Sequence, residues 1–267
     1  MKHVGLNVAA DPLFTISYQG LNAGLVICVA DDPGMHSSQN EQDSRHYAFA
    51  AKVPMLEPAD SEESRLFVKE AYEISEKYNT PVFIKMCTRL AHSQGVVALE
   101  DRVVPEDKVY ERNIAKNVMM PGNAIKRHVF VEQRLKDMAE AANTFVVSKE
   151  GFSKDVPLNR VEMNDTKIGF ITSGIPYTYV KEACPNASVL KLGMVHPLPK
   201  KLIEEFASKV DTLYIFEELE PVIEEQVRAW GIDCIGKEAF TVQGEYSANM
   251  IRKVVLKENL SINTPAE

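Results

Sequence analysis

Short apolar runs alternate along this chain with stretches whose apolar residues recur at helical spacing. The run Leu25 to Ala30 (LVICVA) has no polar residue, which is typical of a strand buried in a parallel sheet. Beyond Asp60, apolar residues return every three or four positions, as on one face of a helix. This alternation predicts an α/β fold, with parallel strands covered by helices.

The pattern divides into two blocks. The expected strands of the first block are Lys2–Val4, Leu25–Ala30, Val53–Leu56 and Pro81–Met86, with helices over Glu41–Lys52 and from Asp60 onward. The expected strands of the second block are Ile168–Ser173, Val189–Val195, Leu213–Phe216 and Ile232–Ile235. Its expected helices are Ile175–Ala183, one opened by Pro199, one from Pro221 to Gly231, and Ser247–Lys257.

Between the blocks the periodicity weakens. Residues 93–126 contain charges, asparagines and a turn at Pro121-Gly122-Asn123, and an amphipathic helix around Val131 to Ala142 follows. We therefore divide the chain into a first domain over 1–125, a linker with a helix over 126–164, and a second domain over 165–267. By this count the first sheet is incomplete, so we expect an apolar edge or face that is poorly covered. The second block is expected to fold independently.

Composition excludes several classes of protein. The chain has 267 residues and a formal net charge of −8, so a basic surface for nucleic acid is not expected. The four cysteines, Cys28, Cys87, Cys184 and Cys234, form no CxxC pair and predict neither an iron–sulfur cluster nor a disulfide framework. The uncharged run from Pro12 to Ala30 holds glycine and polar residues, so we expect no membrane span. These features favour a cytoplasmic protein.

The densest polar stretch, residues 31–46, directly follows the apolar run that ends at Ala30. Ligands of open α/β sheets bind at the carboxyl ends of strands, so this loop is the first candidate site. We select His36 as a catalytic candidate and Asp31, Asp32, Ser37 and Ser38 as cofactor-binding candidates. The alternative is a solvated loop in which Ser38 and Glu41 form a helix capping box. No ligand spacing typical of a metal site is present, and we predict none.

Three other strand-to-helix turns are weaker candidates. The segment MKHVGLN places His3, Gly5 and Asn7 at the turn from a strand to a helix, where a ligand could approach. The signal is weak, because an ordinary turn between a strand and a helix has the same appearance. The turn at Ser173–Pro176 could hold an anion at a helix start, but a plain loop is favoured. The carboxylates of Glu217–Glu220 form either an acidic interface or, by preference, the first turn of a helix.

Three sequence stretches carry a family resemblance: MKHVGLNVAADPL, GLVICVADDPGMHSSQNEQDSR and MLEPADSEE. They resemble the α subunit of indolepyruvate ferredoxin oxidoreductase, one of the thiamine-diphosphate-dependent 2-oxoacid:ferredoxin oxidoreductases. The resemblance extends through VMMPGNAIKRH and the second block, and so covers essentially the whole chain. It implies the later part of a thiamine-pyrimidine-binding domain, followed by a transketolase-C-terminal-like domain.

The resemblance also implies an activity. Members of the family decarboxylate an aryl pyruvate on thiamine diphosphate with magnesium, pass electrons through iron–sulfur clusters to ferredoxin, and transfer the acyl group to coenzyme A. The chain lacks the family's diphosphate motif and cluster cysteines, so it is expected to be truncated at both ends and inactive alone. A β subunit and the remaining α-subunit portions are the implied partners.

By the same resemblance, the turn Lys2–Asn7 and the loop Asp31–Ser38 would face the cofactor and substrate. Arg89, at the end of a strand, is a further positional candidate, and Arg45 is expected to pair with Asp43 or with a phosphate group. The alternative function is a non-catalytic assembly module that binds partner chains and performs no turnover.

Overall fold

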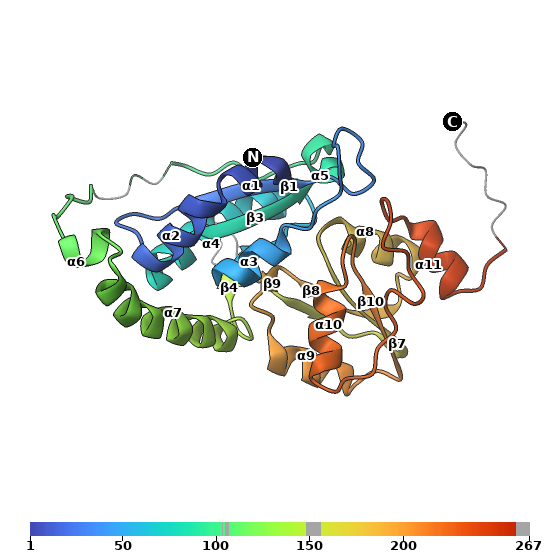
Figure 1. The fold of residues 1–267 in the computed structure, drawn as a ribbon. Coiled ribbons are helices and arrows are strands. Elements are labelled where there is room, and N and C mark those ends of the chain that lie inside the picture. Colours follow the sequence, from blue (N-terminus) through green and yellow to red (C-terminus); the bar gives the residue numbers. More distant parts are fainter. Residues whose placement is uncertain (103, 105–106, 148–155, 260–267) are drawn as a thin grey trace.

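The structure is a computed structural model that describes residues 1–102, 104, 107–147 and 156–259. Figure 1 shows two lobes, each built on a small sheet with helices against it, and the chain crosses between them more than once. The expectation of an α/β fold with two parallel-rich sheets is confirmed.

The first sheet has the strand order β1-β3-β2-β9. Strand β1 (Val26–Asp31) runs parallel to β3 (Val82–Cys87), and β2 (Met55–Leu56) runs parallel to the other edge of β3. Strand β9 (Met194–His196) pairs antiparallel with β2, although it belongs to the second block in sequence. The carboxyl ends of β1 and β3 therefore lie side by side, at Asp31 and Cys87.

Helices of the first block cover this sheet and frame it. They are α1 (His3–Val8), α2 (Ala10–Gln19), α3 (Arg45–Ala51), α4 (Ser61–Tyr78), α5 (Thr88–His92), α6 (Ile114–Asn117) and α7 (Pro121–Ala141). Helix α4 begins as predicted, because the Asp60 side chain accepts a hydrogen bond from the Glu63 backbone N–H. The Glu63 carboxylate in turn accepts from the Ala59 N–H. Its expected apolar face, with Phe67, Ala71 and Ile74, is buried.

The second sheet has the strand order β10-β7-β8-β6. Its strands are β6 (Arg160–Glu162), β7 (Asp165–Ser173), β8 (Ala187–Leu192) and β10 (Thr212–Phe216), of which β6 alone is antiparallel to its neighbour. Helices α8 (Gly174–Ala183), α9 (Lys200–Ala207), α10 (Val222–Ala229) and α11 (Ala248–Val254) surround it. A two-stranded ribbon joins β4 (Val146–Val147) to β5 (Val156–Pro157).

One buried apolar cluster joins the two sheets. It contains Val29 and Phe83 from the first sheet together with Leu190 and Ile215 from the second. Ile223 of α10 belongs to the same cluster. The predicted boundaries at 125 and 165 remain a prediction, but β6 and β9 each pair across the division that they imply.

Four expectations about local structure are wrong. Lys2–Val4 is not a strand: Lys2 makes a single bridge to Ala30, and α1 then begins at His3, which buries His3 and Leu6. Pro121-Gly122-Asn123 is not a turn but the start of α7, because proline suits the first helical position.

The other two errors concern the second block. The run Val189–Val195 breaks at Gly193, where the chain leaves one sheet for the other. Ile232–Ile235 forms only one bridge, between Ile235 and Tyr214.

Some large apolar side chains of the first block are exposed. Val8 on α1 is 85% exposed, and Cys28 on the edge strand β1 is also exposed. In the connector, Val96 and Leu99 are almost fully exposed. Within the described ranges, no helix has the length and apolar character needed to cross a bilayer.

Candidate functional site

The loop that follows β1 is folded back on itself by Asp32. One carboxylate oxygen accepts from the Ser37 N–H at 3.0 Å and the Ser38 hydroxyl at 2.5 Å, and the other accepts from the Thr88 hydroxyl at 2.7 Å. Burial acts to raise the pKa of Asp32, but these donors and Lys2 hold it well below its usual range. Asp32 is therefore a buried carboxylate that shapes the loop.

Asp31, the neighbouring carboxylate, is also buried. Its Oδ2 accepts from the Ser44 N–H at 3.1 Å and the Ser44 hydroxyl at 2.8 Å, and it lies 4.0 Å from the Lys85 ammonium. Its Oδ1 has no hydrogen-bond partner. Burial is the main influence on this group and raises its pKa to about 6, although Lys85 opposes the shift.

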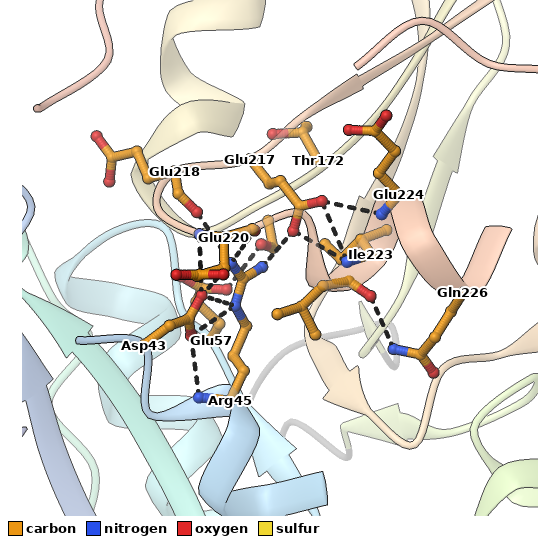
Figure 2. Close-up of polar contacts among 12 residues, drawn as sticks. Asp43, Arg45, Glu57, Thr172, Glu217, Glu218, Glu220, Ile223, Glu224 and Gln226 are labelled. Carbon is orange, nitrogen blue, oxygen red and sulfur yellow. Dashed lines mark hydrogen bonds and ion pairs between the residues drawn. The ribbon is translucent and has the colours of Figure 1, made fainter. Parts of the chain in front are cut away.

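Arg45 connects the two sheets at the base of the same loop (Figure 2). Its guanidinium is 1% exposed, binds both carboxylate oxygens of Asp43, and pairs with Glu217 from the end of β10. It also donates to the backbone carbonyls of Glu218 and Glu220, at 2.9 and 2.8 Å. Burial would lower the pKa of Arg45, but Asp43 and Glu217 raise it well above its usual value.

A second buried ion pair also lies between the two sheets. Lys85 on β3 donates to Glu57 at 2.6 Å, and Glu57 accepts from the Ser173 hydroxyl at 2.7 Å. The turn at Ser173 thus contacts a protein carboxylate, in agreement with the plain-loop interpretation. The Glu217 carboxylate has two kinds of partner. It pairs with Arg45 of the first block, as at an interface, and it accepts from the Ile223 and Glu224 N–H groups in the first turn of α10.

The exposed end of the loop meets two other segments. His36, 52% exposed at its side chain, lies 3.3 Å from one oxygen of Glu245. The other oxygen of Glu245 accepts from Arg89 at 2.5 Å. The Arg89 guanidinium is 5.6 Å from the centre of the Tyr179 ring, whose buried hydroxyl has no partner. We call this set of residues (His36, Arg89, Tyr179 and Glu245) the mouth cluster.

The candidate residues separate into buried and accessible groups. Asp31 and Asp32 are buried and His36 and Ser37 are exposed, whereas Ser38 is half-buried and bonded to Asp32, so it is not a helix cap. Of the N-terminal candidates, Gly5 lies inside α1 and Asn7 accepts from the Tyr47 hydroxyl. His3 is buried with neither ring nitrogen bonded. Lys2, which was not a candidate, joins this turn to the loop by donating to the Ser37 carbonyl at 2.6 Å.

Sequence reasoning missed Glu245 and Tyr179. Arg89 follows a strand and could be found by position, but Glu245 lies in an irregular stretch with no periodic signal. The expected pairing of Arg45 with Asp43 is confirmed. Its pairing with Glu217, 172 positions away, has no local signature.

The structure contains two cavities of note, and one of them adjoins the loop. One of about 140 Å³ lies between the loop and the segments after β10, and its lining includes Glu41, Asp43, Leu219 and Val242. A larger one of about 270 Å³ lies elsewhere, beside Gly20 and Tyr110. We give more weight to the smaller, because it adjoins the carboxyl ends of strands. Among the described residues, no three His, Cys, Asp or Glu side chains are placed to hold a metal ion.

Sequence comparison identifies relatives over most of the chain, although no protein-family model matches it. Indolepyruvate oxidoreductase subunit IorA of Pyrococcus abyssi is 43% identical over 239 residues, which are 87% of this chain. The IorA protein of Methanothermobacter thermautotrophicus is 36% identical over an alignment of 270 positions that covers 96% of this chain. The chain is similar to part of the IorA proteins. It spans 36% and 42%, respectively, of the length of these two relatives.

Both relatives carry the name of an indolepyruvate oxidoreductase subunit, in agreement with the family that the resemblance indicates. A solved structure agrees at the level of the fold. The 2-oxoglutarate:ferredoxin oxidoreductase of Magnetococcus marinus superposes with a TM-score of 0.66 at 14% identity. The match covers 96% of this chain and 52% of that one. The fold of both lobes is therefore shared with that solved structure.

Proposed function

We propose that this chain forms the substrate-facing part of an aryl-pyruvate:ferredoxin oxidoreductase, with indolepyruvate as substrate. The observation that carries the proposal is the loop 31–44. In a chain 43% identical to an IorA subunit, this loop lies at the carboxyl ends of β1 and β3 and presents His36 beside groups from the second block. Strand ends of this kind are where α/β proteins bind their ligands.

The loop contains buried residues that hold its shape and exposed residues that are able to contact a ligand. Asp32 and Arg45 are buried and fully engaged, so they hold the loop and leave no group for a ligand. His36 and Ser37 are exposed and are the groups that we propose contact the substrate or cofactor. The buried Asp31 supports Ser44 at the base of the loop from within.

Thiamine diphosphate, which the family resemblance implies, fits the described residues only in part. The cofactor-binding role proposed for Asp31 and Asp32 does not fit well, because Ser, Thr and Lys side chains already occupy most of their oxygens. No cluster of metal ligands is present among the described residues, so they offer no magnesium–diphosphate site. We therefore propose contact with one end of the cofactor at most, through Ser37 and the turn at Lys2–Asn7.

Coenzyme A, ferredoxin, a β subunit and the further portions of longer IorA chains are the proposed partners. The support is the name of the relatives, which are subunits, together with their length, since this chain matches 36–42% of each. Iron–sulfur clusters would belong to such portions, because the described cysteines are free and three of the four are buried on separate elements.

A chimeric enzyme tests the proposal. The matched region of the Pyrococcus abyssi IorA protein would be replaced by this chain, and reduction of ferredoxin would be followed with indolepyruvate and coenzyme A. We expect turnover with indolepyruvate at least tenfold more efficient than with 2-oxoglutarate. An assembled chimera without turnover would instead support an assembly module, and preference for 2-oxoglutarate would contradict the substrate.

A further inference from the structure

The mouth cluster contains an ion pair whose partners come from different lobes. Arg89 follows β3 in the first lobe, and Glu245 lies in the segment between the Ile235 bridge and α11 in the second. One carboxylate contacts two side chains, with the Arg89 guanidinium at 2.5 Å and the His36 imidazole at 3.3 Å. Arg89 and His36 have side chains about half exposed, whereas Glu245 is 20% exposed.

The buried hydroxyl of Tyr179 is the second observation. A buried polar group without a partner is energetically unfavourable, so such groups are rare and call for an explanation. Tyr179 lies under the Arg89 guanidinium, and the charges of Arg89, Glu218 and Glu245 all act on its pKa. The hydroxyl therefore lies within the mouth cluster and is free to donate to an additional acceptor there.

From this geometry we infer that Glu245 occupies the place of a ligand carboxylate, and that Arg89, His36 and Tyr179 bind the carboxylate of a 2-oxo acid when the Glu245 side chain moves aside. A guanidinium fork fits a carboxylate in two-point contact, and a nearby hydroxyl supplies a further donor. This inference rests on the proposed function for the identity of the ligand.

Displacement of Glu245 is physically inexpensive. Ion pairs with a half-exposed partner contribute little to stability, because water and salt screen them. The backbone next to it is fixed, since the Tyr246 N–H donates to Glu218 and its ring is buried. Only the Glu245 side chain has to rotate for a ligand to enter.

The neighbouring charges also allow an anion to enter. Glu218 is a further carboxylate close to this cluster, and burial raises its pKa, which favours its neutral form. Glu218 would thus repel a ligand carboxylate bound to Arg89 and His36 only weakly. The planar ring of an aryl pyruvate would extend outward from the mouth cluster.

Calorimetry on the purified chain tests the inference without any turnover. The probe is indole-3-propionate, an unreactive aryl carboxylate, and its control is indole-3-ethanol, which has the ring but no carboxylate. We expect Glu245→Gln to tighten indole-3-propionate about tenfold, because the internal competitor loses its charge. Arg89→Gln should weaken it at least fivefold, and neither variant should change the affinity for indole-3-ethanol.

Glu182→Gln is the matched control variant, because Glu182 pairs with Arg252 in an exposed contact elsewhere on the second lobe. It should leave all affinities unchanged. Affinity for indole-3-propionate within twofold of wild type in Glu245→Gln would overturn the inference. Tightening of inorganic phosphate alone would also overturn it, because the anion would not be a carboxylate.

Failure of this inference and failure of the proposed function give different results. If the chimera turns over indolepyruvate but Glu245→Gln has no effect on binding, only the role of the mouth cluster is wrong. If the binding result holds and the chimera prefers another 2-oxo acid, the carboxylate site stands and the proposed substrate is wrong.

Discussion

At the scale of single residues, the loop that follows β1 contains two buried carboxylates and one exposed imidazole. The pair Asp31-Asp32 stood out because carboxylates at a strand end favour ligand binding, yet both are buried and bonded to protein groups. The burial of these two carboxylates could not be predicted from the sequence, since the donors to Asp32 include Thr88, 56 positions away. His36, by contrast, is about half exposed in the same loop.

Substituting Arg45 by methionine tests the buried ion network. Removing one partner of a buried charge pair costs about 3–5 kcal/mol, because Asp43 and Glu217 are left buried without a countercharge. We expect a loss of this size in the free energy of unfolding by urea. Arg252→Met, which breaks an exposed pair with Glu182, should cost less than about 1 kcal/mol. Equal effects of the two variants would contradict the buried role of Arg45.

The pH dependence of stability tests Asp31. Its pKa is about 6 in the folded chain and 3.8 for the unperturbed group, so between these values the folded state binds the proton more strongly. Stability should be greatest below pH 4 for this group and should fall as the pH rises through 6. A shift of two units corresponds to about 3 kcal/mol. Urea unfolding of Asp31→Asn should show a flatter profile from pH 4 to 7; parallel profiles would contradict this.

At the scale of elements, strongly periodic segments were predicted well. Strands β1, β3, β7 and β10 and helices α4 and α8 lie within a few residues of their expected positions. The errors occur where contacts with distant parts of the chain determine which sheet a segment joins. Val189–Val195 is apolar throughout, so nothing in its composition shows that Met194–His196 pairs with Met55 and Leu56 in the other sheet.

Gly193→Ala tests the point where the chain changes sheets. A methyl group at Gly193 would lie 2.1 Å from the Leu158 carbonyl oxygen, and backbone atoms cannot move aside as a flexible side chain can. We expect a loss of more than about 2 kcal/mol in unfolding free energy, by overpacking. Gly122→Ala, in α7 with nothing within 4 Å, should be neutral or stabilising by about 0.5–1 kcal/mol. A tolerated Gly193→Ala would contradict the tight crossover.

At the scale of the whole molecule, the two lobes share a core. The sequence pattern favoured independent folding of the second block, because it contains its own alternating strands and helices. The shared apolar cluster and the pairing of β9 with β2 instead favour one cooperative unit. The sequence could not show this, because a cluster that joins residues as distant as Val29 and Ile223 has no local pattern.

Equilibrium unfolding tests that cooperativity. Trp230, the single tryptophan of the chain, reports on the second lobe by fluorescence, and hydrogen exchange of the β1 and β3 amides reports on the first. We expect both signals to change at the same urea concentration, as in a two-state transition. Two separated midpoints would show that the lobes unfold independently.

The central claim is that the loop 31–44 faces the reacting substrate, and turnover of the chimeric enzyme with His36→Ala tests it most directly. His46→Ala is the matched control, because His46 is equally exposed but lies beside Glu220, away from the mouth cluster. The account predicts that His36→Ala lowers turnover of indolepyruvate at least tenfold, about 1.4 kcal/mol, while the melting temperature stays within a few degrees. Unchanged turnover in His36→Ala, or an equal loss in His46→Ala, would contradict it.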